Sequence, residues 1–540
     1  MKIKLSVFFL LAITLTFGVV GITSASETLI FAISVDVDQL DPGSTSVSQV
    51  VNNIFEGLVK FKAGTTSIEP CLATSWEISA DGKEITFHLR KGVKFHDGTD
   101  FNADAVVFSF ARQYDPNNPY YQYGKWNMWG YLFYDVDKMK KIDDDTVKLV
   151  LKRPNVSILT SLALYRVSMV SPTNAEKYQG DAFKHPCGTG PFKFVEWVKS
   201  DHVTLEANED YWQERAKLDQ LIFKIIPDAS ARLMALEVGE VQGMELPNPA
   251  DFDRIKTNKD LVLMTQPGMN VGYLAMNTGY GYVDENKNNI RDNDSEPLVK
   301  TPGYFEPLTK KKVRQAINMA IDKQAIVDNN YMGSAIKAKT GMPPFMLGYN
   351  DDIEDYSYDP ERAKELLAEA GYPDGFEVTL HVMPVARPYM FDPFRIGEVI
   401  QSYLAAVGIK VKFYQVDWSS YLQEVNDGKH QIALLGWRGD NGDPDYFMNV
   451  YGTNSTSIGM AKNRAFYIND AVQELLAAAV ATYDDEKRAT YYKKIQEMVH
   501  EDAGWVYLFH FTQNVVFRNN IKGFILNPTS MVFFYPVWTE

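Results

Sequence analysis

The chain has 540 residues, of which 45% are hydrophobic and 13% aromatic, so it can bury a large core and is unlike a disordered protein. Its formal net charge of −15 argues against nucleic acids and anionic membrane surfaces as partners.

The N-terminus has the pattern of a secretory signal. Lys2 and Lys4 precede an apolar stretch over residues 5–22, and small residues follow at 23–26. This pattern predicts that residues 1–26 form a signal peptide that is cleaved, which would place the mature protein in the periplasm or another compartment outside the cytoplasm. The alternative is an uncleaved membrane anchor, because the apolar stretch is long enough to span a bilayer.

Cys71 and Cys187 are the two cysteines. An oxidising compartment permits a disulfide between them, but their spacing does not establish one. The spacing excludes a CxxC redox or zinc motif.

Strand and helix patterns alternate from residue 84 onward. The sequence predicts strands at residues 84–90, 145–151 and 192–198, and helices at 102–114 and 360–370. Asn102 is placed to cap the first of these helices. Asp359 and Pro360 are typical of a helix start, and Gly371 of a helix end.

The segment from residue 376 to 440 has the clearest pattern. It predicts strand, helix, strand, short helix and strand, at residues 376–383, 394–408, 409–416, 419–428 and 430–437. Strands that alternate with helices are typical of a parallel sheet in an α/β domain.

Two opposite charges follow strands of this predicted sheet. Arg387 comes after the first strand and Asp440 after the third. The carboxyl ends of parallel strands form the edge where open α/β sheets bind ligands, so this pair suits a zwitterionic ligand. The alternatives are that each is an ordinary surface charge, or that the two pair with each other.

Three aspartates, Asp440, Asp443 and Asp445, lie close together in residues 436–447, which read GWRGDNGDPDYF. Asp, Asn, Gly and Pro all favour turns, so one interpretation is a solvated turn. The other is a site for a cationic group.

Several motifs resemble those of the family 5 extracellular solute-binding proteins, the receptors of peptide and nickel ABC importers. They are found, in the family's order, at residues 72–110, 188–197, 313–327, 387–411 and 436–447. The resemblance implies that Arg387 pairs with the carboxylate of a dipeptide and Asp440 with its α-amine. It places Trp437 and Gly439 beside the ligand.

The family's fold implies a two-lobed, periplasmic-binding-protein-like α/β architecture with an extra small domain and two hinge crossings. Residues 27–66, 187–270 and 510–540 would form a discontinuous domain I, residues 67–186 the small domain, and residues 271–509 the second lobe with the ligand clamp. The resemblance further implies a monomer that delivers its ligand to an ABC transporter permease and uses no cofactor.

Two features depart from the family pattern. Arg438 stands where a small polar residue is expected, two residues from Asp440. Residues 279–305 look like an insertion, and its oxygen-bearing side chains at alternate positions could form a calcium loop. These are Asp284, Asn286, Asn288, Asp292 and Asp294. The alternative is an ordinary surface loop.

Other functions stay open at this point. The sequence has none of the GxSxG, HExxH, Walker A or CxxC motifs, so a secreted hydrolase is a minor alternative. Within the binding class, the rival ligands are longer oligopeptides, nickel chelates and oligosaccharides. Oligosaccharides would use aromatic platforms such as Trp126, Trp129, Trp418 and Trp437.

Overall fold

The computed structural model describes residues 27–45, 47–126, 129–285, 291, 295–387 and 389–540. The predicted signal peptide, residues 1–26, lies outside this part of the chain. Among the described helices, none combines the length and the apolar character needed to cross a bilayer.

One mixed sheet of twelve strands extends through the molecule. Its order is β18 (Ile409–Tyr414), β17 (Phe376–His381), β19 (Ile432–Arg438), β13 (Asn270–Met276), β20 (Trp505–Arg518), β11 (Gly243–Glu245), β1 (Thr28–Ile33), β10 (Gln220–Ile225), β9 (His202–Ala207) and β8 (Phe192–Val198). Two further strands, β12 (Leu261–Pro267) and β16 (Ala335–Lys337), pair with β20 off this path.

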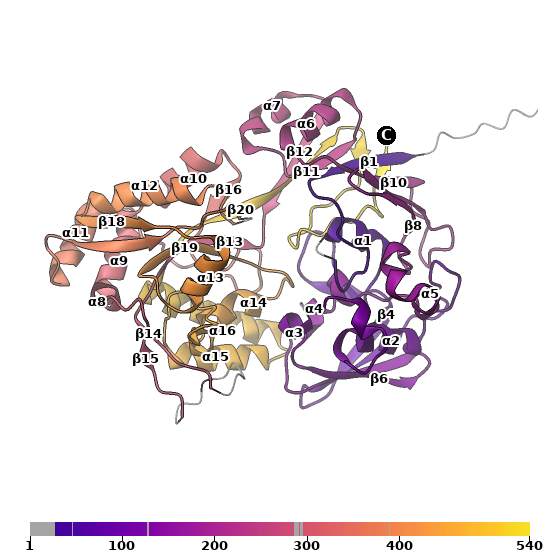
Figure 1. The fold of residues 1–540 in the computed structure, drawn as a ribbon, viewed down its shortest axis with the longest axis horizontal. Coiled ribbons are helices and arrows are strands. Elements are labelled where there is room, and N and C mark those ends of the chain that lie inside the picture. The colour runs from indigo at the N-terminus through magenta and orange to yellow at the C-terminus, as the bar shows by residue number, and fades with distance from the viewer. Residues whose placement is uncertain (1–26, 46, 127–128, 286–290, 292–294, 388) are drawn as a thin grey trace, which may run out of the picture.

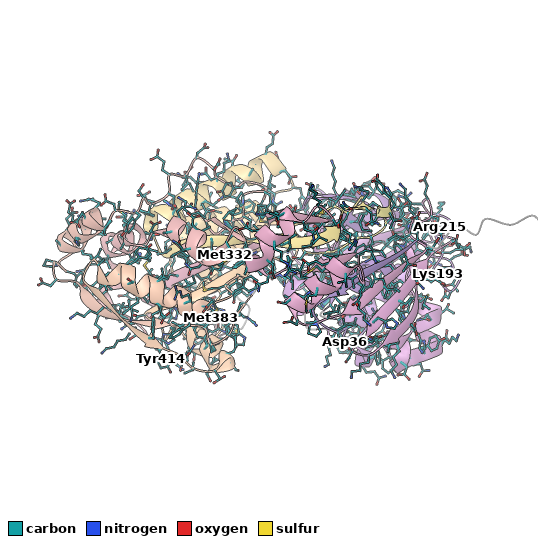
Figure 2. The ribbon with its side chains drawn as sticks, turned by 90° about the horizontal axis from the view of Figure 1, so that it is seen from above. Asp36, Lys193, Arg215, Met332, Met383 and Tyr414 are labelled. Atoms are coloured by element: carbon teal, nitrogen blue, oxygen red, sulfur yellow. The ribbon has the colours of Figure 1, made fainter. Side chains whose placement is uncertain are left out.

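The molecule has two lobes, and β20 belongs to both (Figure 1). The first half of β20 pairs with β13 and β16, while its second half pairs with β11 and β12. Figure 2 shows the lobes side by side, with Met383 and Tyr414 in one and Asp36, Lys193 and Arg215 in the other. The two lobes thus share a continuous backbone element.

The predicted parallel strands are confirmed. β17 pairs in parallel with β18 on one side and with β19 on the other. The helix α12 (Pro393–Ala405) connects β17 to β18, and α13 (Trp418–Asn426) connects β18 to β19. The sheet as a whole is mixed, because β13 runs antiparallel to β19.

The residues predicted to cap the N-termini of two helices do so in the structure. Asn102 accepts a hydrogen bond from the backbone N–H of Ala105 at the start of α2 (Ala103–Tyr114). Asp359 caps α11 (Pro360–Glu369) in the same way, and Gly371 follows it with a φ of 93°. A positive φ is inexpensive for glycine, which explains the end of the helix here.

A separate antiparallel sheet has the strand order β4 (Ala73–Ile78), β5 (Glu84–Leu89), β7 (Thr146–Leu151) and β6 (Val136–Asp143). It packs with α2 around its own apolar core, which includes Phe87, Phe110 and Leu149. This sheet lies within residues 67–186. The division of the chain into three domains with two hinge crossings stays a prediction.

The remaining elements cover these sheets or connect their strands. The helices are α1 (Ser48–Ile54), α3 (Trp129–Leu132), α4 (Ile158–Ser161), α5 (Pro172–Tyr178), α6 (Ala229–Val238), α7 (Phe252–Thr257), α8 (Glu306–Thr309), α9 (Lys311–Ala320), α10 (Lys323–Tyr331), α14 (Pro444–Met448), α15 (Asp470–Val480) and α16 (Asp485–Asp502). The short strands are β2 (Val59–Phe61), β3 (Ile68–Pro70), β14 (Tyr280–Gly281), β15 (Val299–Lys300), β21 (Ile521–Lys522) and β22 (Trp538–Thr539).

Cys71 and Cys187 are both buried and both are free thiols. The Cys71 thiol lies 3.7 Å from a carboxylate oxygen of Glu56. The structure therefore has no disulfide between these two cysteines.

Candidate ligand site

Arg387 lies in the loop that follows β17. Its backbone and that of Met390 exchange two hydrogen bonds of 2.9 Å, which close the loop into a tight turn. The guanidinium carbon lies 4.2 Å from the ring centroid of Trp418, the first residue of α13. This cation–π contact holds the arginine against an aromatic face, and its N–H groups can still bind a ligand.

Tyr389 connects the Arg387 loop to the neighbouring strand. Gly436 lies in β19, and a Cβ atom there would be 2.2 Å from the Tyr389 ring. Only glycine therefore lets the ring pack on the strand that leads to Asp440. Burial raises the pKa of Tyr389, and the nearby Arg387 partly opposes this effect. The sequence prediction missed Tyr389, because its neighbour is distant in the chain.

Asp440 follows β19 and is half-buried. The hydroxyl of Tyr446 donates a hydrogen bond of 2.8 Å to one carboxylate oxygen. Trp437 in turn donates from its indole N–H to the backbone oxygen of Tyr446, at 3.0 Å. The same tyrosine thus positions the carboxylate and is itself positioned by the tryptophan.

Gly439 allows a close approach behind Asp440. A Cβ atom at Gly439 would lie 2.3 Å from the ring of Phe447, which is fully buried. The backbone N–H of Gly439 donates to the backbone oxygen of Met269 at 2.8 Å. Trp437 and Gly439 therefore support the loop, and their contact with a ligand stays a prediction.

Arg387 and Asp440 come from adjacent parallel strands and are not paired with each other. Within the described part of the chain, no ion pair joins either of them to another charged side chain. The alternative in which they neutralise each other does not hold in this structure. Both charges remain available to a ligand at the carboxyl edge of the sheet.

The other two aspartates of the loop have different roles. Asp443 caps α14 and forms a buried ion pair with Arg488, whose Nη2 lies 2.7 and 2.9 Å from the two carboxylate oxygens. Burial raises the pKa of Asp445 to about 7, and the adjacent Asp443 adds to this effect. Asp443 thus forms the start of α14, as a turn-forming residue does, but the predicted solvated turn is wrong for Asp443 and Asp445, because both side chains are buried.

The loop that carries Asp440 contacts the opposite lobe. Asn441 donates from its side-chain amide to the hydroxyl of Ser161 at 3.0 Å. A cavity of about 60 Å³ lies between Trp437 on one side and Tyr134 and Ser157 on the other. Burial raises the pKa of Tyr165 in the opposite lobe, and the nearby Asp440 adds to this.

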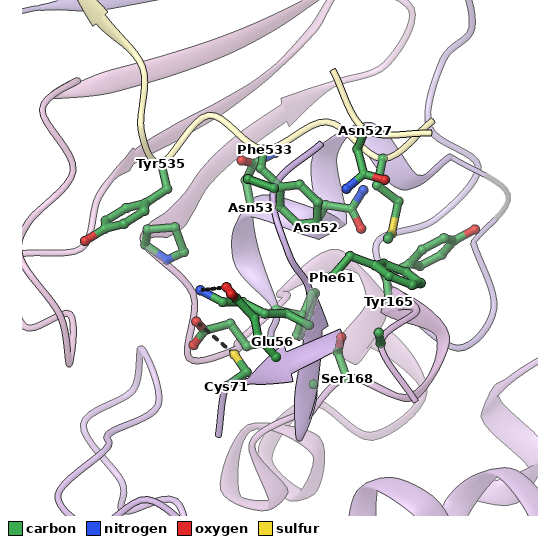
Figure 3. Close-up of a pocket in the computed structure, with 18 of the residues that line it drawn as sticks. Asn52, Asn53, Glu56, Phe61, Cys71, Tyr165, Ser168, Asn527, Phe533 and Tyr535 are labelled. Atoms are coloured by element: carbon green, nitrogen blue, oxygen red, sulfur yellow. Dashed lines mark hydrogen bonds and ion pairs between the residues drawn. The ribbon is translucent and has the colours of Figure 1, made fainter. Parts of the chain in front are cut away.

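A larger cavity of about 270 Å³ lies apart from the two predicted ligand residues (Figure 3). It is lined mainly by apolar and aromatic side chains of the N- and C-terminal segments. At its base, Glu56 accepts hydrogen bonds from Thr189, Tyr211 and Trp212, at 2.7–2.8 Å. Burial raises the pKa of Glu56.

Most of the predicted calcium loop lies outside the described residues, namely Asn286, Asn288, Asp292 and Asp294. Asp284 is described and is buried. Within the described residues there is no group of three or more acidic, histidine or cysteine side chains that could hold a metal ion. The calcium loop stays an untested hypothesis.

Comparison with known protein families gives one match, which covers residues 67–458. The matching family is described as bacterial extracellular solute-binding proteins, family 5, middle region.

Relatives match along nearly the whole chain. The dipeptide-binding protein of Escherichia coli is 39% identical, over 88% of this chain and 87% of its own length. Heme-binding protein A of Haemophilus influenzae is 37% identical, over 91% and 88%. Among solved structures, the periplasmic binding protein DppA of Helicobacter pylori in complex with the peptide STSA is 33% identical, with a TM-score of 0.72 over 95% of this chain and 98% of that chain.

Proposed function

The chain belongs to family 5 of the bacterial extracellular solute-binding proteins, and we propose that it is the receptor of an ABC importer that captures dipeptides. The observation that carries this proposal is the pair Arg387 and Asp440. They are opposite charges at the ends of adjacent parallel strands, and neither has an ion-pair partner in the described residues.

The proposed mechanism is a clamp on the two termini of the ligand. Arg387 offers a planar fork of N–H donors, which fits the two oxygens of an α-carboxylate. Asp440 accepts hydrogen bonds from the α-ammonium group, while Tyr446 keeps the carboxylate in place. Both interactions are charge-assisted, and closure of the lobes strengthens them by excluding water.

The remaining contacts tolerate different side chains. The interlobe cavity beside Trp437 has polar side chains from both lobes, among them Asn155, Asn441 and Lys462. Bridging water in such a cavity can adapt to ligands of different shape. We propose that Trp437 and Gly439 contact the ligand, and that the protein acts as a periplasmic monomer that delivers dipeptides to membrane permease subunits.

The comparisons also define the rivals. A relative that is 37% identical is named a heme-binding protein, and one that is 33% identical is in complex with the peptide STSA, which has four residues. A clamp that fixes both termini favours dipeptides over the tetrapeptide, because each added residue lengthens a peptide by roughly 3.3–3.6 Å. It favours dipeptides over heme, because heme has no ammonium group for Asp440.

The decisive experiment has two steps. Mass spectrometry of the molecules that co-purify with the protein identifies its ligand class. Calorimetry with Ala-Ala, N-acetyl-Ala-Ala, Ala-Ala-Ala-Ala and hemin then tests the clamp. We expect binding of Ala-Ala and at least a hundredfold loss for the acetylated and longer peptides, because each loses an ion pair with Arg387 or Asp440 that lobe closure would bury.

Three outcomes would contradict the proposal. Equal binding of acetylated and free dipeptides would remove the role of Asp440. Tighter binding of the tetrapeptide would make the protein an oligopeptide receptor. Binding of hemin without any binding of peptides would favour the heme alternative.

A further inference from the structure

Arg438 is the last residue of β19 and lies two positions before Asp440. Asp440 lies just beyond the strand, in the bend that follows it. Arg438 therefore places a positive charge two positions along the chain from the carboxylate proposed to hold the ligand's amine.

Arg438 is exposed at the end of β19, and the surroundings of its guanidinium differ from those of other arginines. Within the described residues it forms no hydrogen bond, ion pair or ring contact. Other arginines near the lobe interface do have partners. Arg488 pairs with Asp443, Arg153 pairs with Asp135, and Arg166 donates to the backbone oxygen of Thr45.

Arg438 lies close enough to the other lobe to act electrostatically on Tyr165. Burial raises the pKa of Tyr165, and this tyrosine is affected both by Asp440, which raises the pKa, and by Arg438, which lowers it. Tyr165 belongs to the opposite lobe and lines its large cavity (Figure 3). The two charges of the loop thus lie near the same tyrosine across the interface.

We propose that Arg438 is a specificity residue that selects peptides with Asp or Glu at the first position. This inference rests on the proposed function, since it assumes that Asp440 holds the α-amine. One residue separates Arg438 from Asp440, so their Cα atoms lie at most roughly 7 Å apart. An acidic residue carries its amine and its side-chain carboxylate on one short scaffold, and the long arginine side chain can reach that carboxylate.

The physical basis is an ion pair between the guanidinium of Arg438 and the side-chain carboxylate of the ligand's first residue. A ligand carboxylate beside Arg438 gains a charge-assisted hydrogen bond, while a neutral amide of the same shape gains less. A lysine as the first residue of the ligand would be repelled by the positive charge of Arg438. We therefore expect Glu-Ala to bind about tenfold or more tightly than Gln-Ala, and Lys-Ala to bind more weakly than either.

The test is calorimetry of Glu-Ala, Gln-Ala, Lys-Ala and Ala-Ala on the wild type, Arg438→Gln and Arg395→Gln. Arg395 is an exposed arginine of α12, a different element from the one that carries Arg438, so its variant changes the net charge equally without altering position 438. We expect the ratio of Glu-Ala to Gln-Ala affinity to fall to about one in Arg438→Gln and to persist in Arg395→Gln. Added salt should reduce the ratio in the wild type.

The outcomes separate this inference from the proposed function. If Ala-Ala binds but the wild type treats Glu-Ala and Gln-Ala alike, the Arg438 proposal is wrong and the dipeptide receptor stands. If Arg438→Gln binds every dipeptide more tightly, with no change in the ratio, Arg438 competes with the ligand's amine for Asp440, and the proposal is again wrong. If no dipeptide binds to the wild type, the proposed function itself fails.

Discussion

Arg387 and Asp440 define the smallest unit of function proposed for this protein. Removing one of them would leave the opposite terminus of the ligand without its partner in a closed site. We expect Arg387→Ala and Asp440→Ala each to cost roughly 3–5 kcal/mol, or about 10²–10³-fold in dipeptide affinity. Calorimetry on folded variants measures this loss.

Two controls make the measurement specific. Asp440→Asn keeps the shape of the side chain but removes its charge, so it should lose most of the same affinity. Asp374→Ala removes an exposed carboxylate elsewhere in the lobe and should bind like the wild type. Near-wild-type affinity in both Arg387→Ala and Asp440→Ala would show that these two residues do not bind the termini of the ligand.

Asp445 should make stability depend on pH. Burial raises its folded-state pKa to about 7, from an ordinary value of 3.8. The folded protein therefore holds this proton more tightly than the unfolded chain does. Its contribution to stability is fully present below the unfolded pKa, and it is lost as the pH rises toward 7.

Asp445→Asn fixes this position in a neutral form. We expect the variant to gain stability relative to the wild type between pH 4 and pH 8, by a difference on the order of 3 kcal/mol. Denaturant unfolding at several pH values measures the difference, with Asp374→Asn as a control that should follow the wild type. A difference between Asp445→Asn and the wild type that does not change with pH would show that Asp445 is not protonated in the folded protein.

Among secondary structure elements, those with strong local signals were predictable. β17, β18, β19 and the caps of α2 and α11 follow from periodicity and capping residues over short stretches of sequence. The pairing of β13 with β19 and β20 could not be predicted in this way, because pairing between strands that are distant in the chain produces no local sequence pattern. The family resemblance placed a lobe boundary between residues 509 and 510, which lies within β20, but the local pattern of the sequence does not show which strands β20 joins.

In the candidate site, too, residues next to local patterns were predictable and contacts between distant residues were not. Arg387 and Asp440 could be predicted because each directly follows a recognisable strand. Contacts such as Tyr389 on Gly436 and Arg488 with Asp443 join residues about 45 positions apart or more. These contacts depend on ring placement and burial, which the order of residues alone does not specify.

The insertion at residues 279–305 allows a test at the level of one element. Its alternating oxygens resemble a calcium loop, but Asn289 and Ser295 stand where an EF-hand has glycine and glutamate. We expect the same melting temperature in calcium and in chelator. A rise of several degrees in calcium that Asp284→Ala abolishes would instead assign a calcium site, since binding to the folded state stabilises it.

For the whole molecule, we expect the two lobes to close on the ligand. The clamp lies at the edge of one lobe, and the loop that follows it already contacts the other lobe through Asn441 and Ser161. Solution scattering should show a smaller radius of gyration with saturating dipeptide than without it. Asp440→Ala at the same dipeptide concentration serves as the control and should not contract. An unchanged profile for the saturated wild type would contradict a hinge.

The position of β20 has a consequence for the order of folding. This strand lies in the interior of the large sheet and pairs with β11, β12, β13 and β16, yet it follows all four of them in the chain, the nearest by more than 160 residues. Until residues 505–518 have been made, the strand that lies between β11 and β13 in the sheet is missing, so the part of the sheet in one lobe cannot pair with the part in the other. Contacts between such distant segments form slowly. The large sheet therefore cannot be completed before β20 has been made, so the joining of the two lobes comes after the earlier strands of each lobe are already present.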